Sequence, residues 1–128
     1  MTIVALIFAT LAVVLHVVIF WMKSLAWTGP AARKVFGPAT PEDVAATQDL
    51  AFNQGFYNLF LAVIGAIGVV IFIVGNEDVG ATLIFAGIGA MLAAALVLYI
   101  SNAPKRGAAI RQGVFPLLTV VTMLLGLL

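Results

Sequence analysis

Cysteine is absent from the sequence, which excludes disulfide bonds, thiolate metal sites and thiol chemistry. Charged residues are also scarce, because they make up 9% of the 128 residues, against about 25% in an average soluble domain. The net charge of +1 gives no reason to expect a nucleic-acid partner. The sequence contains no nucleotide-binding loop, catalytic triad, zinc motif or paired carboxylates. It therefore predicts no cofactor, no catalytic residue and no metal site, and it favours a protein that is not an enzyme.

Hydrophobic residues, in contrast, make up 64% of the chain, and the mean hydropathy is +1.23. The few charges fall in small groups that leave four uncharged stretches. A membrane-spanning helix needs about 20 mostly apolar residues, with about 17 as the lower end. The sequence therefore predicts an all-α integral membrane protein surrounded by the lipid bilayer. Its single domain is a four-helix bundle with spans at about residues 3–23, 50–74, 79–100 and 112–128.

The distribution of basic residues predicts the orientation of the bundle. The first connection and its flank carry Lys23, Arg33 and Lys34, and the third carries the other three basic residues. The second connection carries only Glu77 and Asp78. Because basic residues mark the cytoplasmic side of short loops, we expect connections one and three inside and both termini on the outer side.

Two short segments predict where helices begin and end. Thr40 can cap a helix whose first residue is Pro41, and two acidic residues follow where the positive end of a helix favours them. The second helix should therefore begin near residue 41, in water, and enter the bilayer near Leu50. Gly75 can end that helix and Asn76 can cap the third one. So short a link predicts that helices two and three are antiparallel neighbours.

Polar side chains inside the spans are the residues that could carry a function, because each needs a partner in hydrocarbon. His16 lies on a predicted buried face with the small residues Ala5, Ala9 and Ala12. On a helical wheel, residues 53, 54, 57 and 58 share one sector, with the phenylalanines outside it. The predicted ligand-binding residues in this inner-leaflet layer are His16, Lys23, Asn53, Gln54, Tyr57, Asn58 and Gln112. We also expect His16 to couple with Asn53 or Tyr57.

The alternative is that these groups only form hydrogen bonds between helices. Lys23 would then extend its charged end to the membrane surface. In the third helix the sequence predicts a packing stripe of small residues, made of Ala86, Gly87, Ala90, Ala93 and Ala94.

Three motifs resemble one known family. They are residues 27–37 (Trp-Thr-x-Pro-x-x-Arg-Lys-Val-Phe-Gly), residues 53–58 (Asn-Gln-Gly-x-Tyr-Asn) and residues 112–116 (Gln-Gly-x-x-Pro). Together they resemble the bacterial membrane-protein family catalogued as domain of unknown function thirteen hundred and four. The resemblance implies a compact multi-pass protein of the bacterial inner (cytoplasmic) membrane without an assigned activity. The family pattern usually has an acidic residue where this chain has Lys23, so a role that needs a carboxylate there is not expected.

A weaker similarity links the chain to membrane-associated enzymes of eicosanoid and glutathione metabolism, but their Arg-rich motif in helix two is missing. The sequence favours a protein that binds a small apolar or amphiphilic ligand, or one that docks to a membrane complex or to its own copy through small-residue helix faces. A membrane-embedded transferase could use only Lys23, Tyr57 and Arg111. A small exporter would need an intramembrane carboxylate, and a purely structural subunit would need no polar cluster.

Overall fold

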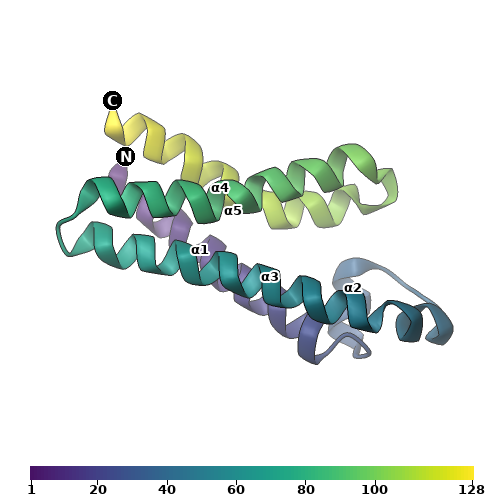
Figure 1. The fold of residues 1–128 in the computed structure, drawn as a ribbon. Coiled ribbons are helices and arrows are strands. Elements are labelled where there is room, and N and C mark those ends of the chain that lie inside the picture. The colour runs from purple at the N-terminus through teal and green to yellow at the C-terminus, as the bar shows by residue number, and fades with distance from the viewer.

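The computed structural model describes all residues 1–128 and is an all-helical bundle (Figure 1). Its elements, in chain order, are α1 (Thr2–Phe20), the π-helical turn η1 (Trp21–Leu25), α2 (Pro30–Phe36), α3 (Pro41–Ile73), α4 (Glu77–Ser101), the 3-10 turn η2 (Ala103–Lys105) and α5 (Arg106–Leu127). Four of these helical segments are long and apolar enough to cross a membrane, as predicted. They are Thr2–Leu25, Pro41–Ile73, Glu77–Ser101 and Ala103–Leu127.

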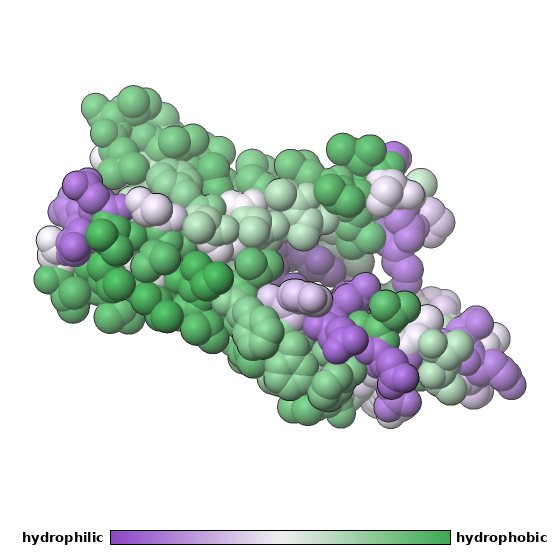
Figure 2. Space-filling model, viewed as in Figure 1, coloured by the Kyte–Doolittle hydropathy of each residue, from purple (hydrophilic) through white to green (hydrophobic).

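The four long helices form a closed ring of neighbours. α1 packs against α3 and α5, and α4 packs against the same two helices from the other side. Both termini and the turn between α3 and α4 lie at one end of the bundle (Figure 1). The connections 26–40 and 102–105 lie at the other end, which we call the basic end because it carries all six basic residues. Hydrophilic residues gather at the basic end and around the turn between α3 and α4, and hydrophobic residues cover most of the length between them (Figure 2).

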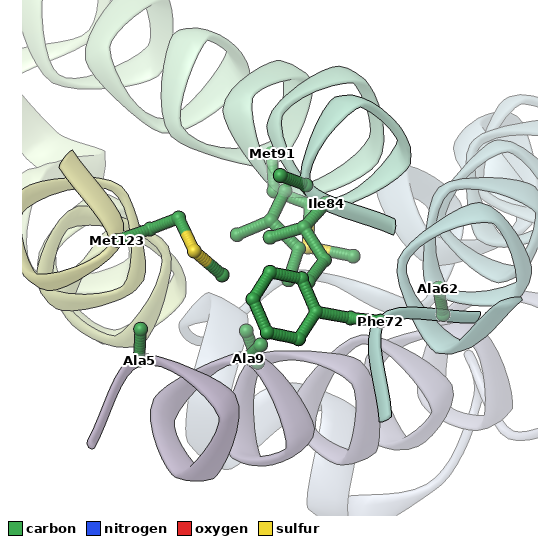
Figure 3. Packing of buried hydrophobic residues seen from close by; sticks show 10 residues of the cluster. Ala5, Ala9, Ala62, Phe72, Ile84, Met91 and Met123 are labelled. Carbon is green, nitrogen blue, oxygen red and sulfur yellow. The ribbon is translucent and has the colours of Figure 1, made fainter. Parts of the chain in front are cut away.

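Small residues hold the helices close together in the core. Ala5, Ala9 and Ala12 are fully buried on one face of α1, as predicted, and large side chains from the other helices fill the space above them (Figure 3). Among these side chains are Ile84 of α4 and Met123 of α5, both without exposed surface.

The predicted packing stripe of α4 is wrong at most positions. The buried residues of α4 are Gly80, Ala81, Ile84, Gly87, Ile88, Met91 and Ala95, so only Gly87 belongs to both sets. The reason lies in α3, whose glycines leave room for large side chains. A methyl group on Gly68 would meet Ile84, and one on Gly65 would meet Ile88. Ala86, Ala93 and Ala94 instead lie on exposed positions of α4.

The predicted helix ends agree with the structure on both sides of α3. The Thr40 hydroxyl accepts a hydrogen bond from the Asp43 amide (3.2 Å), and α3 begins at Pro41. At the other end Gly75 has a φ of +109°, and the Asn76 side chain accepts a hydrogen bond from the Val79 amide (3.2 Å). With 33 residues, α3 is about 50 Å long, well beyond the roughly 30 Å of a hydrocarbon core. It is therefore longer than an untilted span needs, and its acidic residues Glu42, Asp43 and Asp49 all lie in its first turns.

Two features of the basic end differ from the sequence prediction. The first connection contains the short helix α2, which begins with Pro30 and ends at Gly37, where φ is +97°. The last helix is longer than the predicted span 112–128, because α5 begins at Arg106 and its first turn is stabilised by packing against the basic end. In addition, η1 widens the end of the first span. There the Ala26 amide donates to the Trp21 carbonyl (2.9 Å), five residues earlier.

Candidate ligand cleft

A cleft of about 650 Å³ lies at the basic end, between the first half of α3 and the last turns of α4. Figure 2 shows this hollow with hydrophilic residues inside it and along its lower edge. Its inner side is formed by η1, α2, η2 and the first turns of α5. Six helical elements therefore meet around one space.

The floor of the cleft carries two lysines that meet at one aromatic residue. The Lys23 Nζ lies 5.0 Å from the centroid of the Phe36 ring, and the Lys105 Nζ donates a hydrogen bond to the Phe36 carbonyl. Phe36 is buried at the end of α2, so the short helix positions both contacts. Lys23 also donates to the Gln54 Oε1 of α3 (3.1 Å). The two ammonium groups thus come from opposite sides of the bundle to one place.

Trp27 forms the outer part of the floor and is fixed by three contacts. Its indole Nε1 donates to the Thr47 hydroxyl of α3 (3.1 Å). The Arg33 guanidinium lies over its ring at 4.3 Å, and the Phe36 ring centroid is 5.8 Å from that of Trp27. A cation over an indole ring is attracted by the π electrons. These contacts tie α2 to the beginning of α3.

The walls of the cleft divide into a polar and an apolar part. Gln54, Tyr57 and Asn58 of α3 and Gln112 of α5 supply amides and a phenol. The Asn58 Nδ2 donates to the Gln54 carbonyl (2.9 Å), which fixes that amide on the helix. The apolar lining includes Leu61 of α3 with Ala94 and Leu98 of α4. Such a division suits a molecule with a polar head and an apolar chain.

A close contact between η1 and α3 sets the depth of the cleft. The Ser24 hydroxyl donates to the Phe52 carbonyl (2.7 Å), and a methyl group on Gly55 would overlap the Ser24 hydroxyl. Only glycine at position 55 allows this approach. Lys23 is the neighbour of Ser24, so the same contact places its ammonium group beside Gln54.

Five of the seven predicted ligand-binding residues line this cleft, namely Lys23, Gln54, Tyr57, Asn58 and Gln112. Asn53 does not, because it lines a separate shallow hollow with Phe56, Tyr57 and Phe60. Asn53 is two residues from Gly55, which faces Ser24 of η1. Two residues correspond to a rotation of about 200° around a helix. Asn53 therefore points to the far side of α3, and the predicted division between amides and phenylalanines fails at this position.

His16 is also outside the cleft. It is 2% exposed, and its Nδ1 bonds the Ala12 carbonyl of its own helix (2.9 Å). No hydrogen bond joins His16 to Asn53 or Tyr57, so the network that the sequence suggested is not formed. Tyr57 is 70% exposed at the mouth of the cleft, whereas His16 lies deep among the alanines of α1. The prediction had placed the three residues together because their estimated depths and their predicted inward faces agreed.

Sequence reasoning missed several residues that complete the cleft at the basic end, namely Phe36, Thr47, Asn102 and Lys105. Lys105 was counted only among the basic residues that predict the orientation of the bundle. The sequence did contain a signal for these residues. Connections one and three were predicted to lie at the same membrane surface, and each carries basic residues near an aromatic or amide side chain.

The cleft contains few of the groups that catalysis would need. No group of three side chains that could hold a metal ion is present. Of the three residues considered for a transferase, Lys23 and Tyr57 line the cleft. Arg111 lies outside it and donates to the Val35 carbonyl (3.3 Å). The cleft thus presents two ammonium groups, side-chain amides, a phenol and an apolar surface in one place.

The four apolar helices define a multi-pass membrane protein. The model of the family described as Protein of unknown function (DUF1304) matches residues 10–124, so the chain belongs to that family. No curated protein and no solved structure matches the chain. Family membership confirms the resemblance of the three motifs but supplies no activity. A function for the protein therefore has to be argued from the cleft itself.

Proposed function

We propose that this protein binds a small amphiphilic molecule of the inner (cytoplasmic) membrane in the cleft at its basic end. The observation that carries the proposal is a space of about 650 Å³ within the apolar bundle, with two lysines on its floor and with a polar and an apolar part in its walls. Ligand sites in proteins commonly have about 300–1,000 Å³. A lipid-facing groove without a polar floor would suit any acyl chain, whereas this one also offers a place for a headgroup.

Access from the bilayer fits the position of the mouth. Leu50 is 63% exposed and Tyr57 is 70% exposed where α3 borders the cleft, and Ala94 is exposed where α4 borders it. An amphiphile that enters between these helices would lay its chain along Leu61 and Leu98. Its headgroup would then reach the floor without crossing the apolar core.

The basic end is the cytoplasmic end in this proposal. All six basic residues lie there, and Glu77 and Asp78 lie at the opposite end. Since short cytoplasmic loops are enriched in Lys and Arg, both termini would face outward and the cleft would open to the inner leaflet.

A fluorescence experiment tests ligand binding. Trp21→Phe leaves Trp27 of the cleft floor as the single tryptophan. The purified variant would be titrated with two chain-brominated lysophospholipids, one anionic and one zwitterionic, because bromine quenches tryptophan on contact. Saturable quenching by either probe is expected. Ala94→Phe, which fills the cleft mouth, should weaken binding at least about tenfold, whereas Ala93→Phe on the exposed neighbouring position should leave it unchanged.

The paired variants make the result decisive. Equal quenching in the Ala94→Phe and Ala93→Phe proteins would show that the probes reach Trp27 from the general membrane surface, and the proposal would be wrong. Unsaturable quenching in all variants would lead to the same conclusion.

A further inference from the structure

We infer that the cleft selects amphiphiles with an anionic headgroup, a phosphate or a carboxylate, which binds between Lys23 and Lys105. The inference rests on the proposed function, since it names the chemistry of the ligand that the cleft would take. It comes from the arrangement of charge around the floor.

The two lysines form an unbalanced cationic pair. Both ammonium groups contact Phe36, one at its ring and one at its carbonyl, so they lie near each other and their charges repel. No acidic side chain lines the cleft. Three acids lie on the exposed first turns of α3, and Glu77 and Asp78 lie at the opposite end of the bundle. The structure thus brings two like charges together without a carboxylate to balance them.

Repulsion of this kind is strong where water is partly excluded. Two unit charges interact several times more strongly near a protein surface than in bulk water. An anion placed between the lysines would add two attractions that offset their repulsion, and each contact would be a charge-assisted hydrogen bond. A cationic group would add a third like charge.

The cleft floor also has unused hydrogen-bond donors. A lysine ammonium group has three donors, and Lys23 uses one on Gln54 while Lys105 uses one on Phe36. The half-buried side-chain amides of Gln112 and Asn102 line the same cleft and make no hydrogen bond within the protein. A phosphate or carboxylate has several acceptor oxygens. The donors therefore match an anion better than a neutral headgroup.

The first measurement compares headgroups on one chain. Lysophosphatidic acid and lysophosphatidylcholine with the same acyl chain would be titrated against the Trp21→Phe protein, and inorganic phosphate would be titrated alone. The anionic lipid should bind at least about tenfold more tightly than the zwitterionic one, because the choline group of the zwitterionic lipid would add a third positive charge beside the two lysines. Phosphate alone should bind weakly, since it gains nothing from the apolar wall.

The second measurement removes each charge in turn. Lys23→Gln and Lys105→Gln should each weaken lysophosphatidic acid binding about tenfold or more and weaken lysophosphatidylcholine binding less, because the choline cation already offsets the charge of its phosphate. Lys34→Gln is the matched control, because this exposed lysine at the same end does not line the cleft. Thermal unfolding without ligand would show that each variant is folded, and the two cleft lysines give independent tests.

Each alternative outcome has a distinct meaning. Equal affinity for the two lipids, blocked by Ala94→Phe, would overturn the anionic selectivity and leave the proposed function intact. An equal loss in the Lys34→Gln protein would show diffuse surface attraction and overturn the assigned pair. Tight binding of phosphate with no gain from an acyl chain would show that the anion comes from water, which would overturn an amphiphilic ligand.

Discussion

The contact between α3 and α4 near their connecting turn predicts opposite effects for two glycine substitutions on the same helix. A Cβ at Gly80 would lie 2.5 Å from the backbone N and Cα of Phe72. At Gly89, in contrast, a Cβ would meet nothing within 4 Å. Gly80→Ala therefore forces the two backbones apart by roughly 1 Å to reach an ordinary van der Waals distance. Gly89→Ala requires no movement.

The two substitutions share one contribution to the free energy of unfolding and differ in another. Both gain helix propensity, because Ala is about 1 kcal/mol more favourable than Gly in a helix interior. Only Gly80→Ala also pays for overpacking, which typically costs about 1–3 kcal/mol. The difference in unfolding free energy between the variants should therefore be about 1–3 kcal/mol, with Gly80→Ala the less stable protein. Gly89→Ala should be as stable as the unmodified chain or more so.

Unfolding by a denaturing detergent, followed by circular dichroism in mixed micelles, measures this difference. Both variants should be compared in the same micelles, so that any effect of the surroundings on helix propensity cancels. If Gly80→Ala were as stable as Gly89→Ala, the backbones of α3 and α4 could not be in contact at Phe72. The reasoning about helix spacing would then be refuted.

Three further predictions concern the ends, the interior and the orientation of the bundle. Thr40→Ala removes the cap of α3 and should cost about 1 kcal/mol, with faster amide exchange across residues 44–48; unchanged exchange there would contradict a capped helix. His16→Leu should change the free energy of unfolding by less than about 1.5 kcal/mol, because the Ala12 carbonyl keeps its backbone helix bond. Its effect should simply add to that of Asn53→Ala, and a double-mutant cycle on stability in detergent checks this. Single cysteines at Ala39 and Glu77 should label from opposite sides with an impermeant reagent, and labelling of both from outside would contradict the proposed topology.

Features that depend on local sequence were predicted well. The four apolar helices follow from hydropathy alone, because hydrocarbon tolerates no charged surface. The Thr40 and Asn76 caps and the positive φ of Gly75 follow from short-range hydrogen bonding and the conformational freedom of glycine. The burial of Ala5, Ala9 and Ala12 follows from their spacing on one face.

Features that depend on how the helices pack against one another were predicted less well. Nearly every residue of α4 is apolar, so its own sequence does not show which face is buried. The glycines of α3 decide that face by admitting Ile84 and Ile88. Asn53 looked equivalent to its polar neighbours, but the contact of Gly55 with Ser24 turns it away from them. The lysine pair joins two connections that are far apart in the sequence, and no local pattern links them.

The π-helical turn at Trp21–Leu25 has a consequence for how the chain tolerates changes of length. A π-turn holds one residue more than an α-turn, so everything after Leu25 is shifted by about one helical position, or about 100°, relative to a uniform α-helix. Deletion of one residue within this turn would let α1 continue as a regular helix, and its alanine face would keep its packing. The same deletion would leave Trp27 facing Thr47, because four residues of a regular α-turn cover nearly the same rotation as the five residues of the π-turn. In a shorter relative, a one-residue gap at this point would therefore mark a protein that keeps both the bundle and the floor of the cleft.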